Sequence, residues 1–174
     1  MRASGVHALA VAAGLLACTL GISANGQGLE VGDFGMTDPA LARSDYIESC
    51  GGCHGVNGST APAEVPELRG RAGYFMCTPE TRAYLLRLPN VAHSRISDNQ
   101  RLAELMNYVV FVLGQGTVRA GSEPFTGEEV GRERELALSS ANLTQERSRM
   151  VDIVMHECQA PESLRAMYDP PAIQ

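Results

Sequence analysis

The sequence predicts an all-α protein, made of a helical domain over 38–114, a linker over 115–125 and a helical extension over 126–174. Three observations support this fold class. Helix start and stop signals recur along the chain. Apolar residues recur at spacings of three and four, which places them on one helix face. No stretch of any length alternates apolar and polar residues as a strand would.

Residues 1–24 are typical of an export signal, with Arg2 ahead of an apolar stretch over 8–22. That stretch is short for a membrane span, which needs ~20 residues. Cleavage after Ala24 would leave a soluble periplasmic product, which we favour. Alternatively, Leu15-Leu16-Ala17-Cys18 resembles a lipobox, and Cys18 would then be a lipid anchor. The Gly-rich residues 25–37 are expected to form a flexible arm.

The first helix is predicted to open at Asp38-Pro39 and to run to about Cys50, with Leu41, Tyr46 and Ile47 facing inward. Later helices have comparable start signals. The second helix is expected over 81–88, between Thr78-Pro79 and Pro89, and the third from the capping box Ser97-Asp98-Asn99-Gln100 to near Gly114. The fourth should run from Thr126 to about Leu138. The last should begin at Thr144 and stop at Pro161, with one face formed by Met150, Val151, Val154, Met155 and Cys158.

The segment Cys50-Gly51-Gly52-Cys53-His54 is the attachment sequence of a covalent c-type haem. Each thiol can add to one vinyl group of the porphyrin, and the adjacent imidazole becomes the proximal iron ligand. A redox dithiol would need a βαβ context, and a zinc site would need a second Cys/His pair; the sequence has neither. We therefore predict that Cys50 and Cys53 hold one haem and that His54 binds its iron.

Over residues 38–114 the chain resembles the class I c-type cytochromes, which are small monohaem electron carriers. Tyr46 matches the aromatic residue of the family's first helix, and Tyr108 matches that of its last helix, which crosses the first. Pro66-Glu67-Leu68-Arg69-Gly70 is similar to the loop that follows the haem, and Ile96-Ser97-Asp98 to the start of the last helix. The resemblance implies a class I cytochrome c-like helical domain around one haem.

The family usually supplies the distal iron ligand as a Met just before the last helix. Here that place holds His93, which is therefore our candidate for the second metal ligand. Met76 and Met106 are the alternatives, and an open distal position is a further one. The choice matters because Met raises the reduction potential, whereas an open position admits exogenous ligands.

The family also places the loop after the haem near the propionates. Arg69 and Arg71 are therefore candidates for cofactor binding, because a guanidinium meets a carboxylate bidentately. For either residue, the alternative is an ordinary solvated surface Arg.

Two cysteines remain, Cys77 and Cys158, in a compartment that permits disulfides. We predict a bond between them that ties the last helix to the helical domain; two buried free thiols are the alternative.

A looser resemblance points to cytochromes found beside periplasmic alcohol or aromatic dehydrogenases. It rests on the segments 65–70, 84–89 and 105–108. It implies a non-enzymatic electron carrier, with a dehydrogenase as donor and an oxidase or another cytochrome as acceptor. The alternative is a haem enzyme or a gas-binding haem protein with an open distal site. The net charge of −6, with fourteen Arg and no Lys, argues against nucleic acid as a partner.

Overall fold

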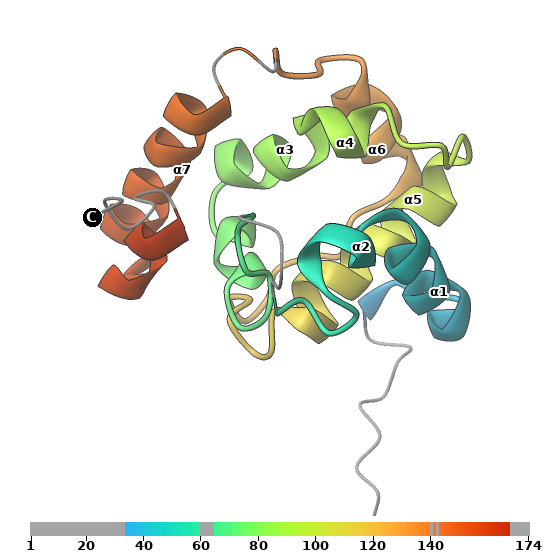
Figure 1. Ribbon diagram of the computed structural model, residues 1–174, viewed down its shortest axis with the longest axis horizontal. Helices are drawn as coiled ribbons and strands as arrows, with labels where there is room; N and C mark the ends of the chain where they lie inside the picture. The colour runs from blue at the N-terminus through green and yellow to red at the C-terminus, as the bar shows by residue number, and fades with distance from the viewer. Residues whose placement is uncertain (1–33, 60–64, 140, 142, 168–174) are drawn as a thin grey trace, which may run out of the picture.

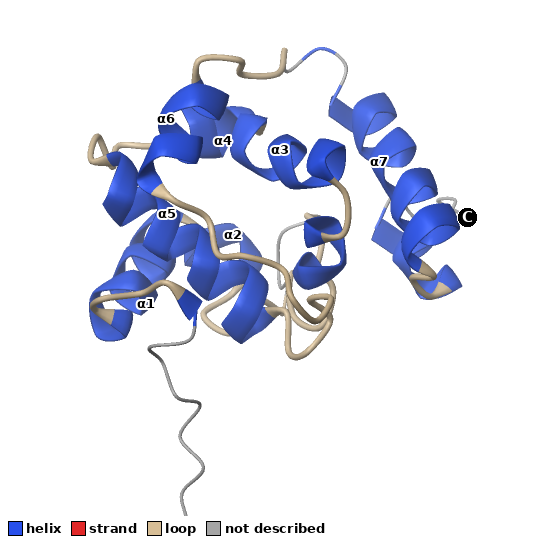
Figure 2. Ribbon diagram, turned by 180° about the vertical axis from the view of Figure 1, so that it is seen from behind, coloured by secondary structure: helices blue, strands red, loops and turns tan. Residues whose placement is uncertain are grey.

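The computed structural model describes residues 34–59, 65–139, 141 and 143–167. These residues form helices and loops without a strand, which confirms the predicted all-α class (Figure 2). None of the helices in this part is both long and apolar enough to cross a membrane. The predicted signal over 1–24, including Cys18, and most of the predicted arm over 25–37 lie outside the described residues.

Helices α3 and α4 lie on one side of the molecule in Figure 1, with α1 and α2 opposite them, while α7 lies at one end. There α7 packs against α3 and the short 3-10 helix η2. In chain order the elements are α1 (Pro39–Ser49), α2 (Gly51–His54), η2 (Ala72–Met76), α3 (Pro79–Arg87), α4 (Pro89–Ala92), α5 (Asn99–Asn107), the π-helix η3 (Tyr108–Leu113), α6 (Gly127–Arg134), α7 (Leu143–Cys158) and the 3-10 helix η5 (Glu162–Met167).

Helix α1 begins where the sequence predicts, because Asp38 Oδ1 accepts a hydrogen bond from the Leu41 amide at 2.9 Å. Its inward stripe consists of Ala42, Asp45 and Tyr46. The prediction that Leu41 faces inward is wrong, since this residue is 40% exposed. Leu41 lies one position before Ala42 and therefore falls outside the buried stripe of a helix with 3.6 residues per turn.

Two other helix starts differ from the sequence-based expectation. Thr78 does cap α3, with Oγ1 accepting from the Thr81 amide at 3.1 Å, but the helix already begins at Pro79. Pro89 ends α3 and also begins the four-residue helix α4, which the sequence analysis missed. Pro89 occupies the first position of α4, where a helix tolerates a residue without an amide hydrogen.

The last helix of the cytochrome-like region is capped by Asp98 rather than by Ser97, since Asp98 Oδ1 accepts from the Arg101 amide at 2.8 Å. Beyond Asn107 the helix continues as the π-helix η3 and ends at Gly114. Helix α6 ends at Arg134, before the predicted Leu138.

Helix α7 begins one residue before Thr144, which is therefore inside the helix and is not its cap. As predicted, Met150, Val151 and Val154 are buried, whereas Met155 and Cys158 are only partly buried.

The predicted linker is held to α5 by a buried side chain. The Phe125 amide donates to Asn107 Oδ1 at 2.7 Å, and Asn107 Nδ2 donates to the Phe125 carbonyl at 3.1 Å. Neither residue exposes more than 1% of its surface. Helix α6, which follows, packs against α5 and α3. The boundaries assigned to the domain, linker and extension remain a prediction.

The extension is fastened to the helical domain. Cys77 and Cys158 form a disulfide, with their Cα atoms 6.1 Å apart, and this confirms the predicted pairing. Arg149 Nη1 lies 2.7 Å from Glu80 Oε1 on α3. Arg71 Nη1 donates to the Ser163 carbonyl, also at 2.7 Å. Contacts at several points therefore fix the path of α7.

Candidate functional site

The haem-attachment motif forms a single tight turn at the end of α1. The Cys50 amide donates to the Tyr46 carbonyl at 2.8 Å, and this bond closes α1. The Cys50 carbonyl then accepts from the Cys53 and His54 amides at 3.2 and 2.9 Å. Residues three and four apart share a face of a helical turn, so α2 brings the two thiols and the imidazole together.

Both thiols of the motif are outside disulfides. Cys53 is exposed, whereas Cys50 is half-buried. Burial raises the pKa of the Cys50 thiol to about 11, and the neighbouring Cys53 contributes to the rise. Cys50 therefore remains a neutral thiol at physiological pH.

The imidazole of His54 is oriented by the loop that follows the motif. His54 Nδ1 lies 2.8 Å from the Pro66 carbonyl oxygen. A carbonyl can only accept, so Nδ1 carries the proton and Nε2 keeps a free lone pair. Burial lowers the pKa of His54; the bond to Pro66 opposes this shift, and the charge of Arg147 adds to it.

These residues fit a c-type haem. The motif provides two free thiols in one turn, and His54 presents a neutral imidazole with an unprotonated Nε2. A hydrogen bond from the second ring nitrogen is the usual way in which a protein fixes the tautomer of a metal-binding histidine.

Two aromatic side chains position the motif. Tyr46 and Tyr108, singled out by the family resemblance, contact each other with ring centroids 5.6 Å apart. The Tyr46 hydroxyl donates to the Gly55 carbonyl at 2.7 Å, just beyond His54. Gly55 has a φ of 72°, and a side chain there would collide with the Ser59 carbonyl. The crossing of α1 and η3 thus fixes the backbone where the motif ends.

The loop after the haem motif folds back onto it. The Gly58 carbonyl accepts from the Leu68 and Arg69 amides at 2.8 and 3.0 Å, which brings Pro66 next to His54. The sequence resemblance included the Pro66 segment but gave the Pro66 carbonyl no role.

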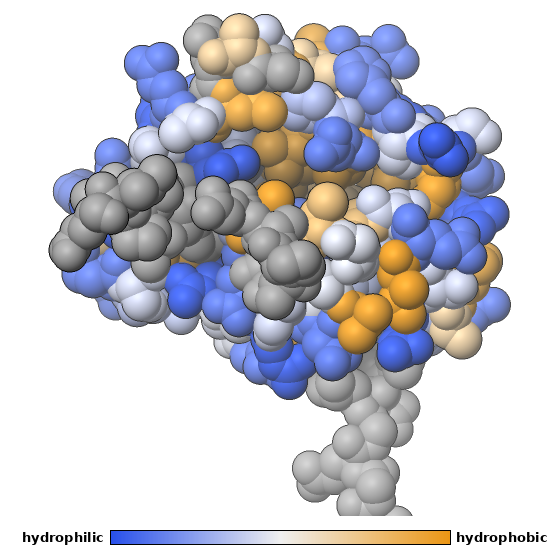
Figure 3. Space-filling model, viewed as in Figure 1, coloured by the Kyte–Doolittle hydropathy of each residue, from blue (hydrophilic) through white to orange (hydrophobic). Residues whose placement is uncertain are grey.

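The surface shown in Figure 3 is hollowed between α3 and α2, and the visible walls of this hollow are hydrophobic. A cleft of about 840 Å³ also lies between the end of α1 and the segment 89–98. Its lining includes Glu48, Ser49 and His93, and Ser49 directly precedes Cys50. His93 is exposed, and the cleft that it borders lies beside the motif because Ser49 also lines it.

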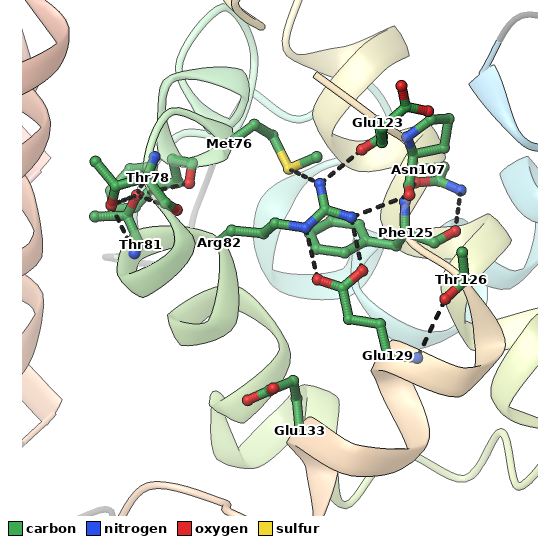
Figure 4. Close-up of polar contacts among 12 residues, drawn as sticks. Met76, Thr78, Thr81, Arg82, Asn107, Glu123, Phe125, Thr126, Glu129 and Glu133 are labelled. Carbon is green, nitrogen blue, oxygen red and sulfur yellow. Dashed lines mark hydrogen bonds and ion pairs between the residues drawn. The ribbon is translucent and has the colours of Figure 1, made fainter. Parts of the chain in front are cut away.

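The two alternative distal ligands are buried. Met76 is 5% exposed, and its Sδ lies 3.8 Å from Nη1 of Arg82 (Figure 4). Met106 is 4% exposed and lies in the core on α5. The identity of the distal ligand therefore stays a prediction.

The two arginines predicted to bind the propionates lie differently. Arg69 is exposed, and its Nη1 is 3.5 Å from the Asn57 carbonyl. Arg71 pairs with Glu67 at 3.3 Å and donates to Ser163 in the extension. Their role at a cofactor also stays a prediction.

Comparison with known proteins gives two related matches. One is a cytochrome c-552 of Thermus thermophilus, 24% identical over 131 residues that cover 64% of this chain and 88% of the relative. The other, also a cytochrome c-552 of Thermus thermophilus, is 23% identical over 118 residues that cover 58% of this chain and 90% of the relative. No protein-family model matches the chain, and no solved structure gives a significant match. With the all-α structure, this distant similarity supports a c-type cytochrome with a cytochrome c-like helical fold.

Proposed function

We propose that this chain is a periplasmic electron-transfer protein with one covalent haem c, bonded to Cys50 and Cys53 and ligated by His54. The observation that carries the proposal is the 2.8 Å contact between His54 Nδ1 and the Pro66 carbonyl, directly behind the two-thiol turn. When bound, the haem iron supplies a centre that gains and loses one electron. The distant similarity to cytochrome c-552 supports the same function.

The residues around the motif would hold and orient the cofactor rather than perform acid–base chemistry. The thiols of Cys50 and Cys53 would anchor it, and the bond to Pro66 would keep the His54 ring at a fixed angle. Because Cys53 is exposed, the edge of the haem attached to it would lie near the surface, where a partner can exchange electrons. A periplasmic dehydrogenase is the proposed donor, and an oxidase or another cytochrome is the proposed acceptor.

Acid–acetone extraction of the exported protein tests the attachment. We expect the colour to remain with the polypeptide in the wild type and in the single variants Cys50→Ala and Cys53→Ala, which each keep one thioether. The double variant should release its haem. Colour that leaves the wild-type protein with the solvent would overturn the proposal.

We propose His93 as the distal ligand, because it borders the cleft that it shares with Ser49. His93→Ala should convert a low-spin spectrum into a high-spin one that responds to carbon monoxide. Asn90→Ala, which lines the same cleft, is the matched control and should leave the spectrum unchanged. A low-spin spectrum that survives His93→Ala would exclude His93 and favour Met76.

The second candidate function is a haem enzyme or gas-binding haem protein with an open distal position. The burial of Met76 against Arg82 and of Met106 in the core favours it over methionine ligation. The reduced wild-type protein discriminates between the two functions. A visible spectrum unchanged by carbon monoxide supports the electron carrier, and a shifted spectrum supports the open site.

A further inference from the structure

One arginine on α6 binds the segment that joins α4 to α5. The Arg134 guanidinium donates to the Ala92 and Ile96 carbonyls at 3.0 and 3.3 Å. It also donates to Asn99 Oδ1 at 2.9 Å, and the Ser94 carbonyl is a fourth acceptor at 3.5 Å. Ala92 is the last residue of α4 and Asn99 is the first of α5. The contacts therefore extend from one end of the segment to the other.

All four acceptors of Arg134 are neutral oxygens. Within the described part of the chain, Arg134 takes part in no ion pair. The carbonyls at the end of a short helix, and those in a segment without helix or strand, have no partner within regular secondary structure. A guanidinium presents several donors in a fixed planar fork. Arg134 thus holds a segment of irregular backbone in one conformation.

The held segment carries the proposed distal ligand. His93 lies between Ala92 and Ser94, and Arg134 binds the carbonyls of both neighbours. The same segment lines the cleft of about 840 Å³ beside Ser49, which precedes the two-thiol motif. Arg134 is not one of the described residues that line this cleft. It therefore contacts the segment from outside the cleft, while His93 borders the cleft itself.

We infer that Arg134 is a positioning residue for His93, because its hydrogen bonds keep the segment in the place from which the imidazole binds the iron. This inference rests on the proposed function, with His93 as the distal ligand. It makes α6, which follows the predicted linker, a support of the cofactor site. Loss of these bonds should raise the fraction of molecules in which His93 is detached and the distal position is open.

Imidazole binding to the ferric, haem-loaded protein measures this fraction, because imidazole reaches the iron only when His93 has left it. Arg134→Gln should strengthen this binding by about tenfold or more, since that is the effect of losing even one hydrogen bond made by a charged group. Imidazole binds as a neutral molecule, so loss of the arginine charge does not itself attract or repel it.

Arg87→Gln is the matched control. It breaks the 2.7 Å pair between α3 and Glu133, the residue before Arg134 on α6, but removes none of the bonds to the segment. Imidazole binding should therefore stay at the wild-type value in Arg87→Gln. An equal gain in both variants would show that any loosening of α6 opens the site, and would overturn the specific role of Arg134.

A double variant tests whether Arg134 acts through His93. His93→Ala should bind imidazole more tightly still, and the addition of Arg134→Gln should then change nothing, because no distal side chain is left to position. Unchanged binding in Arg134→Gln alone, or the same further gain in the His93→Ala background, would overturn the inference. NMR of the reduced wild type is independent of any variant: a slowly exchanging Arg134 Nε proton supports the bond to Ala92, and a rapidly exchanging one overturns it.

Failure of the proposed function gives different results. If haem is extracted from the wild type, covalent attachment fails and the inference falls with it. If haem is retained but His93→Ala leaves imidazole binding unchanged, His93 is not the distal ligand; the inference is then overturned, while the electron carrier with covalent haem stands.

Discussion

Replacement of Arg82 by Met should destabilise the fold more than replacement of other surface arginines. Arg82 Nε and Nη2 each lie 2.6 Å from a carboxylate oxygen of Glu129 (Figure 4). Its guanidinium also donates to the carbonyls of Glu123 and Pro124, and it lies 4.3 Å from the centre of the Phe125 ring. One side chain therefore joins α3, the predicted linker and α6.

The magnitude follows from the exposure of this ion pair. The side chains of Arg82 and Glu129 are 17% and 18% exposed. Breaking a fully buried pair costs about 3–5 kcal/mol, because one charge is left without a partner. Partial access of solvent reduces this cost, and loss of the aromatic contact adds about 0.5–1 kcal/mol. We expect Arg82→Met to lower the free energy of unfolding by about 2–4 kcal/mol in total.

Urea unfolding followed by far-ultraviolet circular dichroism measures this change. Arg132→Met is the matched control, since its pair with Glu128 is 60% and 86% exposed and should contribute about 0–0.5 kcal/mol. The double variant Arg82→Met/Glu129→Gln should lose less than the sum of the single losses, because each change already breaks the pair. A loss below about 0.5 kcal/mol for Arg82→Met would refute the reasoning.

Two further predictions concern the disulfide and Tyr46. Replacing Cys77 and Cys158 by Ser should lower the free energy of unfolding by about 4–5 kcal/mol, because the unfolded chain gains the entropy of an open loop with a sequence separation of 81. Separate free-thiol peptides in a non-reduced digest of the wild type would contradict the bond itself. Tyr46→Phe removes the 2.7 Å bond to Gly55 and should cost about 1 kcal/mol near neutral pH. Burial raises the pKa of Tyr46 from 10.0 to about 12, so the stability present below pH 10 should fall as the pH rises toward 12. In Tyr46→Phe this alkaline loss should be smaller, and an equal loss in both proteins would show that another group causes it.

The sequence predicted those features that depend on local chemistry. Thr78, Thr126 and Asp38 cap their helices as expected, because an Ncap side chain needs only an amide two or three residues ahead. The turn that holds Cys50, Cys53 and His54 likewise depends only on hydrogen bonds between residues three and four positions apart. The pairing of Cys77 with Cys158 was predictable because few cysteines remained to choose from.

Features that depend on distant segments were not predictable in this way. Tyr46 is buried as predicted, but nothing near Leu41 in the sequence shows that the inward stripe includes Ala42 and Asp45 in place of Leu41. Likewise, the ion pair between Arg149 on α7 and Glu80 on α3 depends on where α7 docks.

The fastening of the extension determines how the protein would respond to a protease. A cut in the segment between α6 and α7 would leave two chains joined through Cys77 and Cys158. The carboxyl-terminal fragment would stay at a high effective concentration beside its docking surface, held also by the contacts of Arg149 and Ser163. Such a nicked molecule would migrate as one species on a non-reducing gel and separate into two only after reduction.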